Sequence, residues 1–185
     1  MTQDDDPAGW RVIGWMGGLY AALAAAACAW IGLRAGAVGF LSLAGDGWAG
    51  AGLGAGLASG VVVFGAAASR AFRWYAGMEA ELRRVVGLLT PAQIAALALA
   101  SGIAEELFFR GALQGAVGWV AAGLLFGLLH LPVRRALVPW TVLATALGLL
   151  FGWVADRTGG VVGVTVAHAG VNAVNLWRLC GGKTH

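Results

Sequence analysis

Residues 91–130 decide the fold of this chain, and they read PAQIAALALASGIAEELFFRGALQGAVGWVAAGLLFGLLH. Nearly all of these side chains are apolar, but Glu105, Glu106 and Arg110 interrupt the first half. A helix that crosses a bilayer needs about 20 mostly apolar residues, so this stretch is long enough for two crossings. We therefore predict two antiparallel helices joined by a turn near Gly118.

The composition of the whole chain is typical of a membrane protein. Of its 185 residues, 59% are hydrophobic and 11% are charged, and the mean hydropathy is +0.79. Soluble domains usually carry about 25% charged residues. A chain this apolar is better solvated by lipid, so an integral membrane protein is predicted. The formal charge is +3 and no long basic run could follow a phosphate backbone, so nucleic-acid binding is not expected.

Apolar stretches on both sides of residues 91–130 extend the same pattern. The expected fold class is all-α: a polytopic membrane helical bundle with about six transmembrane helices and one interfacial amphipathic helix. The amphipathic helix is expected over residues 69–89, where Tyr75, Met78 and Leu82 recur at helical spacing among charged residues. With no internal repeat or linker, residues 1–185 are predicted to form a single membrane domain. The crossings are predicted over residues 10–33, 48–68, 91–117, 118–132, 137–154 and 161–179.

Two local signals refine these boundaries. Thr90 and Pro91 predict a helix start, with threonine as the N-cap and proline at the first helical position. In the second span, Gly52, Gly56 and Gly60 recur at every fourth position. This spacing would be costly in a soluble helix but is typical of a close helix contact in a membrane.

The basic residues predict the orientation of the helices. Cytoplasmic loops of membrane proteins carry an excess of Lys and Arg, so both termini are expected in the cytoplasm. The Ala-, Gly- and Arg-rich composition indicates a bacterial source, hence the inner membrane. The acidic start at residues 4–6 is unlike a secretory signal, so the first span is expected to remain as an anchor. The basic residues placed inside are Arg11, Arg70, Arg73, Arg83, Arg84, Arg134, Arg135, Arg178 and Lys183.

Ionisable residues at membrane depth are costly and mark functional positions. Glu105 and His130 each lie about twelve residues from the predicted turn, or roughly 18 Å along a helix. They should therefore lie at the same depth. Glu106 and Arg110 are four residues apart and can pair on one helix face, which leaves Glu105 free to point elsewhere.

The last span carries a second polar group. His168 and Asn172 are four residues apart, so they share a helix face and can offer two donors to one anionic oxygen. The alternative for this pair is a hydrogen-bonded contact between helices. For Asn175, one turn further on, packing is the better interpretation.

Together these residues resemble a known family. The chain contains Glu105-Glu106-Leu-Phe-Phe-Arg110, then Phe126-Gly-Leu-Leu-His130, then His168-Ala-Gly-Val-Asn172. This set is similar to the E-E-x-x-x-R, F-x-x-x-H and H-x-x-x-N motifs of the CPBP intramembrane proteases, which include CAAX proteases, bacteriocin-processing proteins and Rce-type endopeptidases. The resemblance covers residues 91–179, which would form the catalytic core.

The resemblance implies roles for six of these seven motif residues. Glu105 would act as a general base on a water molecule together with His130, while His168 and Asn172 would form the oxyanion site. Glu106 and Arg110 would hold this arrangement in place. Glu105, His130 and His168 could instead bind zinc. An HExxH helix is absent, and we expect no metal and no other cofactor.

The predicted function is that of an intramembrane endopeptidase that cleaves a membrane-associated protein or peptide within the bilayer. The alternative is a non-catalytic membrane protein that confers bacteriocin immunity or binds a partner. A transporter with buried Glu and His is disfavoured because the chain has no paired, repeated halves. The substrate, the cleavage site and the oligomeric state are not encoded in any recognisable pattern.

Overall fold

A computed structural model describes residues 7–45, 47–132 and 134–181, and helices dominate this part of the chain. The predicted all-α class is therefore confirmed. The predictions made for residues 4–6 and Lys183 lie outside the described residues. The helices are α1 Pro7–Ser42, α2 Gly47–Ala71, α3 Arg73–Val86, α4 Pro91–Glu106, the π-helix η2 Leu107–Leu113, α5 Gln114–Leu129, the 3-10 helix η3 Arg135–Leu137, α6 Val138–Thr158 and α7 Val162–Cys180.

The chain reverses direction within residues 91–130, as predicted. Gly118 has φ 81° and ψ 162°, a backbone conformation that breaks the helix and that favours glycine. Phe109 and Phe126 are separated by seventeen positions in the numbering, yet their ring centroids are 5.1 Å apart. A straight helix would place them about 25 Å apart at 1.5 Å per residue, so the two halves run antiparallel.

Four stretches of the described chain are long and apolar enough to cross a bilayer. The reversal at Gly118 divides one of them into two arms. The helix α7 is not among the four, since His168, Asn172 and Arg178 reduce its hydropathy. The prediction of six crossings stays a prediction. The four stretches are Ile13–Ser42, Gly47–Ala71, Pro91–Leu129 and Arg135–Thr158.

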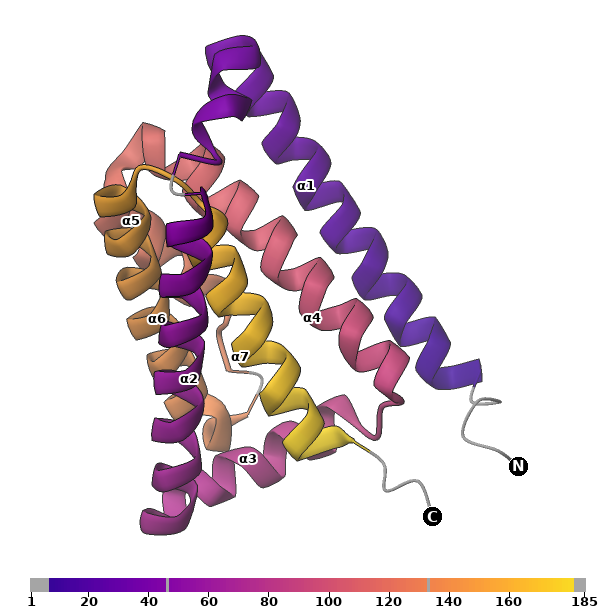
Figure 1. Cartoon of the computed structure of the whole chain (residues 1–185). Helices are drawn as coiled ribbons and strands as arrows, with labels where there is room; N and C mark the ends of the chain where they lie inside the picture. The colour runs from indigo at the N-terminus through magenta and orange to yellow at the C-terminus, as the bar shows by residue number, and fades with distance from the viewer. Residues whose placement is uncertain (1–6, 46, 133, 182–185) are drawn as a thin grey trace.

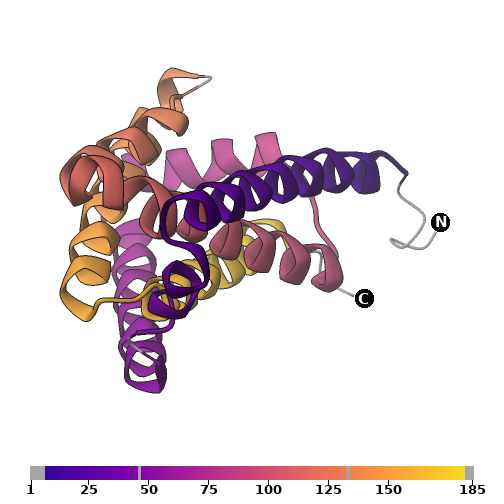
Figure 2. The same ribbon diagram turned by 90° about the horizontal axis from the view of Figure 1, so that it is seen from above.

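The helix α7 lies at the centre of the arrangement, between α2 and α4 (Figure 1). The helices α5 and α6 pack on each other, and α1 lies along α4 and η2. The view from above shows α1 on the side of α4 away from α2 (Figure 2). This order brings the polar residues of α4, α5 and α7 toward one another.

The amphipathic helix α3 lies across one end of the bundle, where it contacts α2, α6, η3 and α7 (Figure 1). It is shorter than predicted, because Phe72 has extended φ and ψ angles and separates it from α2. Its buried face carries Tyr75, Met78 and Glu81, and its opposite face exposes charged residues such as Arg73 and Arg84. The predicted amphipathic helix is thus confirmed, and its position in the membrane interface stays a prediction.

The start of α4 follows the predicted capping pattern. Gln93 donates its backbone N–H to Thr90 Oγ1 at 3.3 Å, and Thr90 donates its own to Gln93 Oε1 at 2.9 Å. Both bonds satisfy backbone donors that a helix start leaves unpaired. Just before this cap, Leu89 donates its N–H to the carbonyl oxygen of Cys180 at 2.8 Å, which joins α4 to the end of α7.

Two details of the first two spans were predicted wrongly. The helix α1 does not end at Arg34 but continues through a kink at Gly36 to Ser42. The proposed glycine contact is also wrong, because a Cβ added at Gly52 would meet nothing within 4 Å. Gly54 makes the close contact instead, where a Cβ would lie 2.0 Å from the carbonyl oxygen of Gly163. The residues Gly52, Gly56 and Gly60 line a shallow apolar groove of about 580 Å³.

Candidate active site

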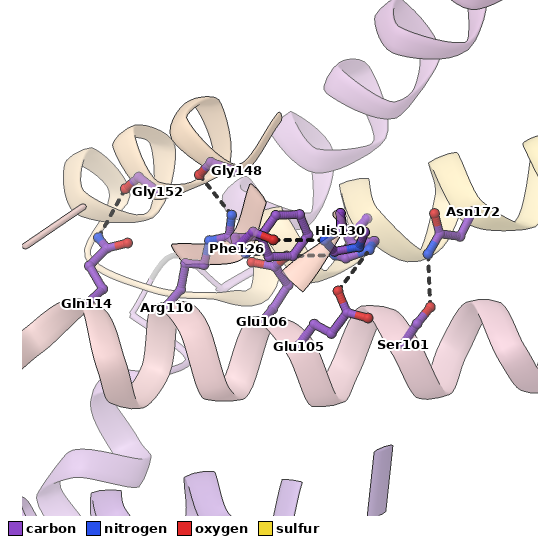
Figure 3. A network of polar contacts seen from close by, with 11 residues as sticks. Ser101, Glu105, Glu106, Arg110, Gln114, Phe126, His130, Gly148, Gly152 and Asn172 are labelled. Atoms are coloured by element: carbon purple, nitrogen blue, oxygen red, sulfur yellow. Dashed lines mark hydrogen bonds and ion pairs between the residues drawn. The ribbon is translucent and has the colours of Figure 1, made fainter. Parts of the chain in front are cut away.

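Two adjacent carboxylates end α4 and point in different directions. Successive residues of an α-helix are rotated by about 100°, so Glu105 and Glu106 cannot share one face. Glu106 is fully buried at 0% exposure, and Glu105 is 9% exposed. Figure 3 shows both side chains among the groups contributed by the neighbouring helices.

Glu106 is the centre of a buried ion network. Arg110 Nη1 donates to Glu106 Oε1 at 2.9 Å, and Nη2 donates to the carbonyl oxygen of Gly148 on α6 at 2.8 Å (Figure 3). The predicted pairing of Glu106 with Arg110 is therefore confirmed. Nδ1 of His168 lies 2.7 Å from the same carboxylate oxygen, a contact that spacing along the sequence did not predict. Glu106 thus joins α4, η2 and α7, and Arg110 extends the network to α6.

The π-helix η2 follows the two glutamates and was not predicted. A π-helix has i→i+5 hydrogen bonds and therefore more residues per turn than an α-helix. Two successive side chains, Phe109 and Arg110, are both buried here, at 2% and 6% exposure. Single π turns occur frequently at functional sites. Nothing in the residues 107–113 distinguishes them from an ordinary apolar helix.

The ring of Phe126 packs against both histidines and the arginine. Its centroid lies 4.5 Å from that of His130 and 5.9 Å from that of His168. The Arg110 guanidinium lies 4.8 Å from the same centroid, a cation–π distance. Phe126 therefore fixes the spacing of the two imidazole rings. This gives a physical role to the phenylalanine of the F-x-x-x-H motif.

His130 ends α5, and its orientation is fixed by three neighbours. Nδ1 lies 2.8 Å from the carbonyl oxygen of Phe126, which can only accept, so this nitrogen carries a proton. In the neutral ring Nε2 is then an acceptor. The ring packs edge-on against Trp140 with centroids 5.0 Å apart. The Thr141 hydroxyl donates to the carbonyl oxygen of His130.

Glu105 faces the imidazole of His168 across a short gap. His168 Nε2 lies 3.9 Å from Glu105 Oε2, which is too far for a direct hydrogen bond (Figure 3). Oε2 is buried and has no hydrogen-bond partner among the described residues. A water molecule can bridge polar atoms at such a separation.

Asn172 lies one turn beyond His168 and bonds to a residue that the sequence analysis missed. Its Nδ2 donates to Ser101 Oγ at 2.9 Å, and Ser101 donates in turn to the carbonyl oxygen of Ala98 at 3.3 Å (Figure 3). The equal spacing of Ser101 to Glu105 and of His168 to Asn172 was the available signal. Because α4 and α7 run antiparallel, Asn172 lies opposite Ser101 when His168 lies opposite Glu105.

Comparison with known proteins agrees with the motifs. Residues 87–174 match the family model described as type II CAAX prenyl endopeptidase Rce1-like. This part of the chain, slightly less than half of it, is similar to the Rce1-like family. The chain is also 36% identical over 80 residues to the uncharacterized protein YpbD of Bacillus subtilis, an alignment that covers 42% of this chain and 41% of YpbD. No solved structure matches the chain.

The matched region contains all seven motif residues, since the first, Glu105, and the last, Asn172, both fall within 87–174. The resemblance to the CPBP proteases is therefore confirmed. The four long apolar helices and the similarity to this family support an integral membrane protein. The individual roles of the motif residues remain proposals.

The orientation of the histidines bears on the zinc alternative. Metal-binding histidines usually donate one ring N–H to a carboxylate or a carbonyl and bind metal through the other nitrogen. His168 and His130 both have Nδ1 occupied in this way. However, no three His, Cys, Asp or Glu side chains gather closely enough to hold a metal ion in the part of the chain that the structure describes. Metal content is therefore measured in the experiment below.

The approach of α4 to α7 beside the site depends on Gly102, which gives a testable prediction. A Cβ at this position would lie 2.9 Å from both the Cβ and the backbone nitrogen of Ala169. We expect Gly102→Ala to lower the free energy of unfolding by about 1–3 kcal/mol, as overpacking does. It should also lower turnover, because α4 carries Glu105 and α7 carries His168.

Gly115 offers a matched control, since it is also helical and a Cβ there would meet nothing within 4 Å. Gly115→Ala should be neutral or slightly stabilising. Denaturant unfolding in detergent and turnover in liposomes measure both effects. Equal behaviour of the two variants would show that the close approach at Gly102 is unimportant.

Proposed function

We propose that the chain is an intramembrane endopeptidase that hydrolyses a peptide bond of a membrane-associated protein or peptide, with Glu105 as the general base. The observation that carries the proposal is the buried Oε2 of Glu105, which has no hydrogen-bond partner among the residues that the structure describes and lies 3.9 Å from His168 Nε2. An unsatisfied buried carboxylate oxygen is costly unless it serves a purpose such as activating water. The family description supports the same class of activity.

In this proposal a water molecule binds between Glu105 and the imidazoles. Glu105 takes a proton from the water as its oxygen attacks the carbonyl carbon of the scissile bond. Nε2 of His130, which is an acceptor in the neutral ring, orients the same water. The protonated Glu105 then gives its proton to the leaving nitrogen as the C–N bond breaks. Water is consumed, and an acid and an amine are released.

The oxyanion of the intermediate is assigned to His168 and Asn172. In this assignment Nε2 of His168 donates to the oxyanion while Nδ1 faces the Glu106 carboxylate, so the ring carries a proton on both nitrogens. One Nδ2 hydrogen of Asn172 is used by Ser101, which leaves the other for the substrate. Preorganised donors of this kind stabilise developing negative charge.

A comparison of two asparagines tests this assignment. Asn172→Ala should lower kcat by about 10²- to 10³-fold, the usual cost of losing an oxyanion donor. Asn175→Ala, one turn further along α7 and similarly half-buried, should leave kcat within about twofold. Turnover of a reporter peptide in liposomes measures both. An equal loss in the two variants would indicate general damage to α7 and would remove Asn172 from the mechanism.

The membrane arrangement belongs to the proposal. We place six crossings in the bilayer, with α3 in the cytoplasmic interface of a bacterial inner membrane. Three arginines of the set predicted to face the cytoplasm, Arg84, Arg134 and Arg178, pair with glutamates of α3, which supports a cytoplasmic position for the α3 end of the bundle. The substrate would enter as an extended segment, because a peptide bond within a helix is shielded from attack. We propose that residues 91–179 form the catalytic core of one membrane domain.

The test uses purified wild-type protein in liposomes with two fluorescent probes, a farnesylated peptide ending in a CAAX sequence and an unprenylated single-span peptide. Cleavage that survives chelation, in protein without stoichiometric metal, supports a glutamate-type protease. Zinc that is lost in His130→Ala and His168→Ala variants, together with chelator-sensitive cleavage, would make it a metalloprotease. If neither peptide is cleaved, membrane proteomics must supply a native substrate before binding or immunity becomes the better account.

A further inference from the structure

The helix α3 buries a carboxylate that the proposed mechanism does not use. Glu81 is 7% exposed although it lies on a short helix at the end of the bundle. Burying a charge is unfavourable unless the group is paired. Its partners therefore indicate what this residue does.

The two carboxylate oxygens of Glu81 bind two arginines, one within α3 and one outside it. Oε2 accepts from Arg84 Nη1 at 3.2 Å, a contact within α3 itself. Oε1 accepts from Arg134 Nη1 at 2.6 Å, a contact with the segment between α5 and η3. That segment follows directly on His130. Glu81 thus links α3 to the chain that continues from a proposed catalytic histidine.

A second contact fixes the other end of the same segment. Leu137, which ends η3, is 2% exposed and packs with Tyr75 and Met78 of α3. Trp140 packs on this cluster and also places its ring 5.0 Å from that of His130. The backbone of His130 is bonded from the same side by the Thr141 hydroxyl. Arg134, Leu137 and Trp140, whose ring packs against His130, therefore all contact α3 or the cluster that α3 forms.

We propose that Glu81 is a positioning residue for His130, acting through its ion pair with Arg134. This inference rests on the proposed function of His130, but the contacts that connect Glu81 to His130 do not rest on it. Loss of the pair releases the segment after His130 while the apolar packing of Leu137 remains. The imidazole then moves relative to Glu105, and small misplacements of a catalytic group lower turnover severely.

The position of His130 can be measured without any activity. The chain has three histidines, so labelling histidine alone with ¹⁵N and ¹³C in lipid nanodiscs gives few resonances, which His130→Gln assigns. Glu81→Gln and Arg134→Gln should both shift the ring resonances of His130 and leave those of His168 in place. The double variant should show no more change than either single variant, because the two residues act as one unit.

Arg84→Gln is the matched control. Arg84 binds the same carboxylate but belongs to α3, and its side chain is 75% exposed. The Arg84→Gln substitution should leave the His130 resonances and the turnover unchanged. In liposomes, Glu81→Gln and Arg134→Gln should lower kcat by about 10- to 100-fold with KM unchanged. Glu81→Asp, which keeps the charge, should recover part of kcat.

The outcomes separate this inference from the proposed function. If Glu81→Gln fails to fold, Arg134→Gln still decides, because the Arg134 side chain is 63% exposed and its loss should be tolerated. His130 resonances that stay unchanged in Arg134→Gln, or that move equally in Arg84→Gln, would overturn the positioning role whether or not the protein cleaves peptides. Shifted resonances in a protein without hydrolytic activity would leave the positioning role intact and remove the proposed function.

Discussion

Glu105→Gln should lower kcat by about 10²- to 10⁴-fold, the usual contribution of a general base. The amide has nearly the shape of the carboxylate but cannot take a proton from water. Because Arg110 pairs with Glu106 and not with Glu105, the variant should fold normally. Turnover of a reporter peptide in liposomes, together with the thermal unfolding of the same preparation, measures the two expectations.

Asp156→Asn is the control for this substitution, since it makes the same chemical change at an exposed position near the end of α6. It should keep kcat within about twofold. Wild-type turnover in Glu105→Gln would show that Glu105 is not the general base. A comparable loss in both variants would show that the assay responds to surface charge and not to the site.

Arg110→Met should destabilise the protein by about 3–5 kcal/mol, because it leaves the Glu106 carboxylate buried at 0% exposure with its cation removed. The bond from Nη2 to Gly148, which ties η2 to α6, is lost as well. Denaturant titration of the detergent-solubilised protein measures the free energy of unfolding. Adding Glu106→Gln to Arg110→Met should recover part of the loss, since the unpaired charge is then gone.

Arg157→Met serves as the comparison, because Arg157 is exposed and its guanidinium lies over the ring of Trp153, 5.4 Å from the ring centroid. Its replacement should change the free energy of unfolding by about 0.5 kcal/mol or less. If Arg110→Met were no more destabilising than Arg157→Met, the network around Glu106 would not hold the site together.

The main features of the fold follow from elementary rules that act locally. The hairpin at Gly118 could be predicted because two apolar arms need a break between them. Thr90 and Pro91 could be placed because a helix start favours threonine at the N-cap and proline at the first helical position. The pairing of Glu106 with Arg110 followed from helical spacing alone.

The features that escaped prediction depend on contacts between helices. The bond from His168 to Glu106 joins residues 62 positions apart, and that from Asn172 to Ser101 joins residues 71 apart. Which glycines of α2 face α7 depends on the rotation of that helix, so Gly54 and not Gly52 makes the contact. The π-helix η2 has no compositional signal, and its buried Arg110 bonds to Gly148 of α6, a residue that is distant in the sequence.

The central claim is that Glu105 drives proteolysis in the membrane, and terminal proteomics tests it most directly. Membranes are compared from source cells that lack the chain and from the same cells supplied with wild-type protein or with Glu105→Gln at equal abundance. The account predicts new protein termini, within or beside membrane segments, that appear only with the wild-type chain. The same termini in cells supplied with Glu105→Gln would contradict it.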